Sequence, residues 1–136
     1  MTLQVELVVP DGELWSGNAR MVIAKTLDGD IGLLGSHPSV LGILVPGSVV
    51  EIRDPEDAGS AQDPIVRAAV LSGFLSVHDD RVSIMAREAT LGNQVDRAAV
   101  QSELDAALSE GGPGGDEESA EVKYARARLR AAGDGS

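Results

Sequence analysis

The chain has 136 residues, enough for one domain with a buried core, and its 43% apolar content is ordinary. Its 22 acidic residues against 11 basic ones give a net charge of −11, which argues against nucleic acid or an anionic lipid surface as a partner and favours a partner that presents basic residues. The lack of cysteine excludes disulfides and thiolate metal sites, and no apolar run approaches the roughly 20 residues of a membrane-spanning helix.

Short strands are predicted over the first two thirds of the chain. Residues 3–7 alternate apolar and polar side chains directly after Met1-Thr2, so we expect no signal or transit peptide. Asp11-Gly12 indicates a turn before a second strand that begins at Glu13. Further strand-like runs cover residues 21–24, 31–34, 40–45, 48–52, 66–72, 73–77 and 81–85. Some eight to ten short strands are typical of a β-sandwich or flattened barrel, with an aliphatic core because only Trp15, Phe74 and Tyr124 are aromatic.

Two connections between these strands have distinct patterns. Residues 54–64 are polar and rich in turn formers, which predicts an exposed loop. Asp79-Asp80 separates two alternating runs by two residues, which fits a tight hairpin, although this pair is a weaker turn signal than Asp-Gly.

The pattern becomes helical after residue 93. Asp96 can cap a helix, and Val100, Leu104 and Leu108 follow at four-residue spacing on one face. The glycine-rich run 111–115 ends this helix, and residues 121–132 form a second one. The second helix carries a narrow stripe of mostly small residues, with two arginines one turn apart beside it: Val122, Ala125, Leu129 and Ala132, with Arg126 and Arg130. Such short helices need a surface to pack on, and the thin stripe predicts reversible docking.

Residues 26–47 form a candidate contact surface. Glycines and prolines alternate there with apolar runs, and polar side chains fall at the bends: Asp28, Asp30, Ser36 and His37. The alternative is that these are ordinary turn residues. No catalytic constellation is present, since neither His37 nor His78 has a nucleophile or a ligand-spaced neighbour. Two aspartates are too few for a cation site, and no Lys-Ser or Lys-Thr pair follows the glycines, so we expect no metal, phosphate loop or cofactor.

Two segments carry a family resemblance. Asp28-Gly29-Asp30-Ile31-Gly32-Leu33-Leu34, with His37 and later Pro46-Gly47, is similar to the pattern Glu-Gly-Glu-Ile-Gly-Ile-Leu-Pro-Gly-His followed by Lys-Pro-Gly. Residues 71–77 leading into 81–86 are similar to Gly-Gly-hydrophobic-hydrophobic-Glu-Val followed by Val-Thr-Ile-Leu-Ala. Together with the order of strands and helices, this resembles the epsilon subunit of the rotary F-type ATP synthase over nearly the whole chain.

The resemblance implies a ten-stranded β-sandwich over residues 1–90 and a two-helix regulatory hairpin over residues 91–136. It implies a non-catalytic rotor subunit that binds the gamma subunit, rests on the c-ring and couples rotation to ATP synthesis. The contact with the c-ring would include Asp28, Asp30, Ser36 and His37. The hairpin could lie on the sandwich or extend toward the alpha/beta catalytic head and oppose ATP hydrolysis. The protein would be peripheral, without a transmembrane segment, on the cytoplasmic face of a bacterial plasma membrane.

Some positions depart from the family pattern. Gly35-Ser36 replaces Pro-Gly, which should reshape the bend locally. Family members that bind ATP carry Ile/Leu-Asp-x-x-Arg-Ala on the first helix, whereas Ala99-Val100 stands here in place of Arg-Ala. We therefore expect poor ATP binding, with Arg126 and Arg130 paired to Glu103 or Glu110. Two other hypotheses stay open: a free-standing acidic β-sandwich that binds a small molecule in its interior, and a glycine-rich enzyme fragment, which the lack of a nucleophile–base pair disfavours.

Overall fold

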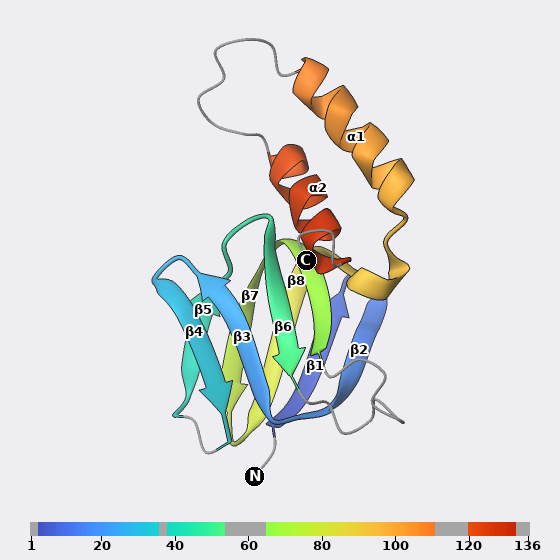
Figure 1. The fold of residues 1–136 in the computed structure, drawn as a ribbon. Helices are drawn as coiled ribbons and strands as arrows, with labels where there is room; N and C mark the ends of the chain where they lie inside the picture. The colour runs from blue at the N-terminus through green and yellow to red at the C-terminus, as the bar shows by residue number, and fades with distance from the viewer. Residues whose placement is uncertain (1–2, 36–37, 54–64, 111–119, 133–136) are drawn as a thin grey trace.

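The computed structural model describes residues 3–35, 38–53, 65–110 and 120–132, and shows a folded β-sheet followed by two helices (Figure 1). The strands in these residues are β1 (Leu3–Val9), β2 (Gly12–Ala19), β3 (Met21–Thr26), β4 (Gly29–Leu34), β5 (Val40–Ile43), β6 (Ser48–Arg53), β7 (Ile65–His78) and β8 (Arg81–Leu91). A short 3₁₀ helix, η1 (Gly92–Gln94), leads into α1 (Arg97–Glu110) and α2 (Ala120–Ala131).

The strands follow the order β2-β1-β8-β7-β6-β3-β4, with β5 paired to β7. The β1–β8 pair is parallel, with Val5 opposite Val82, and the other pairs are antiparallel. Strand β7 pairs with β6 through its first half, with β5 through its second half, and with β8 along most of its length. The sheet folds over on itself, so that β6, β3 and β4 lie in front of the other strands in Figure 1.

An aliphatic core fills the space between the two layers, as the composition predicts. Alternate residues of the strands point inward, and Leu7, Leu33, Ile52, Leu75 and Ile84 are fully buried. The one tryptophan, Trp15, is only partly buried at the edge of this core. Burying these side chains is the main source of stability for the sheet.

The ten strands and barrel that we expected are not seen, since the described residues form eight strands. The runs 66–72 and 73–77, expected as two strands, are one strand, β7, with a bulge between Val70 and Gly73. A Cβ atom at Gly73 would collide with the backbone of Met85, so the bulge requires glycine. In the described residues β2 and β4 stand at the two ends of the strand order, and no ladder closes the sheet into a barrel.

Local signals in the sequence were reliable. Asp79 and Asp80 have φ angles of 50° and 62° and form the two-residue turn between β7 and β8, as predicted. Asp96 caps α1 by accepting a hydrogen bond of 3.1 Å from the backbone N–H of Ala99, also as predicted. The predicted loop 54–64, the glycine-rich turn 111–115 and the pair Ser36-His37 lie outside the described residues. Within the described ranges, neither helix is long and apolar enough to cross a membrane.

Candidate interaction surfaces

Helix α2 packs on the outer side of the sheet, against β6 and β7 (Figure 1). The residues in this contact are Tyr124, Ala127 and Ala131 of the helix with Val49, Ala69 and Leu71 of the sheet. The Tyr124 hydroxyl is hydrogen-bonded to the Thr90 hydroxyl at 2.7 Å. Burial raises the pKa of Tyr124 above its ordinary value of 10.0, and the hydrogen bond with Thr90 opposes part of that rise. The neutral tyrosine is therefore the form that suits the packed helix.

Two glycines allow α2 to approach the sheet this closely. A Cβ atom at Gly47 would overlap Lys123, whose carbonyl carbon would lie only 2.7 Å from it. A Cβ atom at Gly92 would overlap the backbone of Ala131, with the carbonyl carbon at 2.8 Å. Any side chain at either position would push the helix away, so these glycines determine how α2 docks.

Helix α1 packs on α2 through a second apolar cluster. Its buried residues are Val100 and Leu104 of α1 with Val122, Ala125 and Leu129 of α2. Beside it, the Arg128 guanidinium donates a hydrogen bond of 2.6 Å to Glu103 and lies 4.6 Å from the centre of the Tyr124 ring. A groove bordered by Leu71 and Glu88 of the sheet lies beside this helix pair.

The structure places the residues expected to be regulatory at different depths. Asp96 caps α1. The contact between the two helices contains Val100 and Leu104 of α1 and Val122 and Leu129 of α2, whereas Leu108 is 46% exposed. Glu103 pairs with Arg128 rather than with either arginine that we expected, Arg126 or Arg130. Arg130 instead donates to the carbonyl of Gly47 at 3.3 Å, and Arg126 is exposed. The Glu110 side chain lies outside the description.

Asp28 and Asp30 lie at the turn between β3 and β4. Thr26, which the sequence reasoning did not single out, shapes this turn: its hydroxyl donates to the carbonyl of Gly29 at 2.7 Å and accepts from the N–H of Asp28 at 3.2 Å. Asp28 and Asp30 are both exposed. The other two residues of the predicted contact, Ser36 and His37, are not described, so this set stays a prediction.

Exposed apolar side chains form a surface that the sequence reasoning missed. Ile43, Phe74 and Met85 stand side by side on β5, β7 and β8, because Ile43 pairs with Phe74 and Phe74 pairs with Met85. Leu41 lies on the same face of β5 as Ile43, and Val8 pairs with Met85 on the adjoining strand β1. The exposed fractions of Leu41, Ile43, Phe74 and Met85 are 69%, 59%, 43% and 46%. We call Val8, Leu41, Ile43, Phe74 and Met85 the apolar row.

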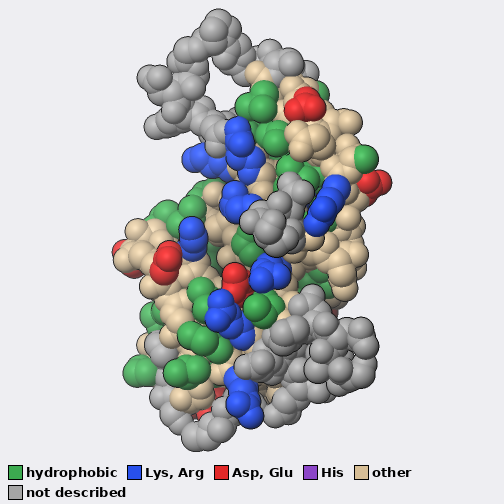
Figure 2. Space-filling view, in the orientation of Figure 1, with side chains coloured by type: hydrophobic (Ala, Val, Ile, Leu, Met, Phe, Trp, Pro, Cys, Tyr) green, Lys and Arg blue, Asp and Glu red, His purple; other side chains and the backbone are tan. Residues whose placement is uncertain are grey.

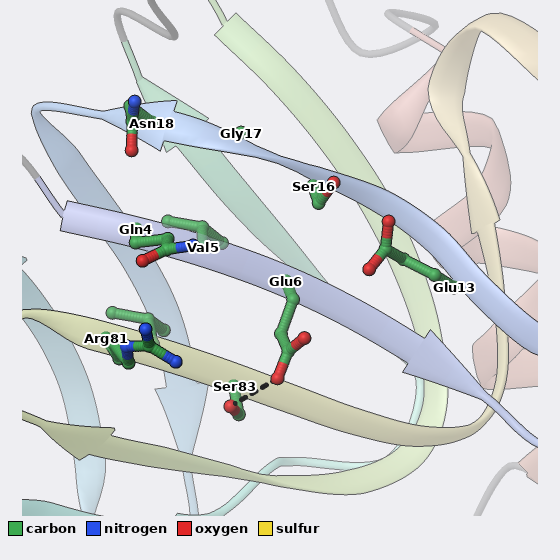
Figure 3. Close-up of a pocket in the computed structure, with 10 residues that line it drawn as sticks. Gln4, Val5, Glu6, Glu13, Ser16, Gly17, Asn18, Arg81 and Ser83 are labelled. Atoms are coloured by element: carbon green, nitrogen blue, oxygen red, sulfur yellow. Dashed lines mark hydrogen bonds between the residues drawn. The ribbon is translucent and has the colours of Figure 1, made fainter.

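A polar groove of about 350 Å³ continues this outer face across β2, β1 and β8 (Figure 3). Among its polar side chains, Ser83 donates a hydrogen bond of 2.9 Å to Glu6, and Arg81, Gln4 and Glu13 surround this pair. An apolar centre with a polar border is the composition of a protein–protein interface. The face made by β5, β7, β8 and β1 is therefore suited to binding a protein.

Comparisons with known proteins place the chain in a family. A family model described as "ATP synthase, Delta/Epsilon chain, beta-sandwich domain" matches residues 2–92. The ATP synthase epsilon chain of Thermobifida fusca is 47% identical over 135 residues, covering 96% of this chain and 91% of that protein. The ATP synthase epsilon chain of Streptomyces griseus is 39% identical over 129 residues, covering 95% and 94% of the two chains.

Two solved structures share the fold. A chain in the mitochondrial ATP synthase of Euglena gracilis aligns with a TM-score of 0.66 and 19% identity, over 98% of this chain and 81% of that one. A chain in the central stalk and c-ring structure of the Tetrahymena thermophila mitochondrial ATP synthase aligns with a TM-score of 0.56 and 19% identity, over 97% and 91%. At this identity the likeness concerns the fold alone.

Proposed function

We propose, from the premise that this chain belongs to the family of ATP synthase epsilon chains, that it is the rotor subunit which joins gamma to the c-ring. The predicted family resemblance is confirmed, and the chain is a non-catalytic subunit. In this proposal it lies in the central stalk at the cytoplasmic face of a bacterial plasma membrane. Residues 1–90 transmit rotation, and residues 91–136 restrain ATP hydrolysis.

The apolar row is the observation that carries the gamma contact. Four of its large apolar side chains are exposed by 43% or more on one face. Their contact with water is unfavourable, so a partner that covered them would gain binding free energy. The polar groove beside the row would supply the rim of that interface. We therefore assign the gamma subunit to the face made by β5, β7, β8 and β1.

We assign the contact with the c-ring to the turn between β3 and β4. Asp28 and Asp30 are exposed there, and the hydrogen bonds of Thr26 fix the backbone that presents them. Carboxylates on a fixed turn complement basic residues in the polar loops of a ring, at up to about 1 kcal/mol for each exposed pair. Ser36 and His37 complete the proposed contact on the strength of the family pattern.

The hairpin would act by leaving the sheet and extending toward the alpha/beta head. Docked on the sheet, it would permit hydrolysis, and extended, it would oppose it. We also propose that it binds ATP poorly. Ala99 stands where the family motif has an arginine, and Arg130 is engaged with the carbonyl of Gly47.

Phe74→Asp tests the gamma assignment. The substitution puts a charge at the centre of the apolar row without entering the core, so binding to purified gamma should weaken by about tenfold or more while the fold is retained. Leu34→Asp is the matched control, because Leu34 is 57% exposed on β4, in the other layer. Titration calorimetry would measure both affinities. Equal affinities for gamma in the two variants would refute the assignment of this face.

A further inference from the structure

A groove of about 240 Å³ runs beside α2 on the face opposite the apolar row. The half-buried side chains of Ile23 on β3 and Val49 on β6 contribute its apolar lining. Three cations border it from three different elements: Lys25 on β3, Arg67 on β7 and Arg130 on α2.

The two carboxylates of this groove do not balance its cations. Glu51 accepts hydrogen bonds of 3.1 and 2.9 Å from Arg53 through one oxygen, and its other oxygen lies 3.9 Å from Nε of Arg67. One carboxylate thus faces two guanidinium groups, at side-chain exposures of 44% for Arg53 and 35% for Arg67. Asp30, the second carboxylate, lies opposite Lys25 in the β3–β4 pair.

The lining of the groove has one more cation than carboxylates, and neither Lys25 nor Arg130 forms an ion pair with a described residue. The hydrogen bond of Arg130 goes to an uncharged carbonyl, that of Gly47. Figure 2 shows Lys and Arg side chains gathered beside α2 and over the front layer of the sheet. A positive face on a chain of net charge −11 attracts anions against the field of the whole molecule.

We propose that this groove, bordered by Lys25, Arg67 and Arg130, binds a carboxylate-rich segment of another subunit of the same complex. Cations from three elements on either side of an apolar lining suit an extended chain of Asp and Glu residues, whose methylene groups would cover Ile23 and Val49. Glu51 orients the guanidinium groups of Arg53 and Arg67 and neutralises only one of their two charges. The remaining positive charge attracts the carboxylates of the partner segment. This inference rests on the proposed function, since the occupant belongs to the assembled enzyme.

Zero-length cross-linking with a carbodiimide tests the proposal, because the reagent joins a lysine amine directly to a carboxylate that touches it. The chain has two lysines, Lys25 and Lys123, so mass spectrometry distinguishes the products formed by Lys25 from those formed by Lys123. In the complex isolated from native membranes, Lys25 should be linked to an Asp or Glu of another subunit. Arg67→Glu should lower the yield of that product about fivefold. Arg20→Glu, the same charge change at an exposed residue that lines neither this groove nor the polar groove beside the apolar row, should leave the yield unchanged.

The outcomes separate this inference from the proposed function. Co-purification of the chain with gamma tests the proposed function and does not depend on the groove. If the chain co-purifies but Lys25 links only to Asp30 or Glu51 of its own chain, or to nothing, the groove has no acidic occupant and the inference is overturned. Equal loss of yield in Arg67→Glu and Arg20→Glu would overturn it as well, because the attraction would then come from the overall charge of the chain and not from this groove.

Discussion

Helices α1 and α2 are of similar length, 14 and 12 residues, but they are held in different ways. Helix α2 is buried on two sides, by the sheet through Tyr124 and by α1 through Leu129. Helix α1 buries only Val100 and Leu104 among its described side chains, and both face α2. The contact between hairpin and sandwich is therefore made by α2, and α1 is joined to the sheet mainly through it.

This difference changes the expectation that docking depends on a thin stripe. Three residues of the predicted stripe face α1: Val122, Ala125 and Leu129. The sheet is contacted by a separate face of α2 that contains Tyr124. Movement of the hairpin thus requires α2 to lose its contact with the sheet, and α1 can accompany it without breaking a large contact of its own.

Gly92→Ala should have the largest effect on this arrangement. The new methyl group would overlap the backbone of Ala131, so we expect the docked state of α2 to lose about 2–3 kcal/mol. Hydrogen exchange of the α2 amides should rise, and the reconstituted enzyme should hydrolyse ATP more slowly because the hairpin is released. Gly32→Ala is the control, since its methyl group would meet only the flexible end of Met21, at 3.1 Å. Unchanged protection of α2 in Gly92→Ala would contradict the assignment of α2 as the docking element.

Substitutions on α1 should separate its two apolar positions. Leu104→Ala removes a side chain buried between the helices and should cost the helix pair about 2 kcal/mol. Leu108→Ala, one turn further on at an exposed position, should cost less than about 0.5 kcal/mol. Thermal unfolding followed by circular dichroism measures both. If Leu104→Ala instead destabilised the sheet as strongly as the helices, α1 would be joined to the sheet directly.

The smallest effect is a pH dependence that comes from Tyr124. Burial raises its pKa when α2 is docked, so docking is fully stabilised below the ordinary pKa of 10.0 and is lost as the pH rises through the raised value. Tyr124 is the only tyrosine, and the absorbance of its phenolate reports this directly. The midpoint should lie above 10.0, move further up in Thr90→Val, and return toward 10.0 in Gly92→Ala. A midpoint at 10.0 in the native chain would mean that Tyr124 is exposed and α2 undocked.

Turns and caps could be predicted from the sequence because a few adjacent residues determine them. Asp79-Asp80 fits the two-residue turn, and the cap at Asp96 depends on one side chain and one N–H three residues later. The continuity of β7 could not be predicted in this way. A glycine bulge and a strand break have the same local sequence, and only the ladder with β8 distinguishes them.

The surfaces were harder to predict than the fold. Residues 40–44 contain no polar side chain, which could have indicated that neither face of β5 is polar, but only pairing with Phe74 shows which residues form the row. Ala127 and Ala131 contact the sheet because Gly47 and Gly92 allow a close approach of α2. The sequence around these alanines does not indicate that glycines far away in the chain will lie beneath the helix. The pairing of Glu103 with Arg128 rather than Arg126 likewise depends on how the helices are rotated.

The parallel pairing of β1 with β8 also determines when the sheet can close. Strand β1 is synthesised before the other described strands, but one of its two neighbours in the sheet, β8, is the last of them. Until β8 is made, the inward side chains of β1, among them Val5 and Leu7, have no cover on that side. Because such distant pairing must pay the entropy of closing a long loop, folding should be slow and largely post-translational. The helices follow directly after β8, so they emerge only once the sheet on which α2 docks has all of its strands.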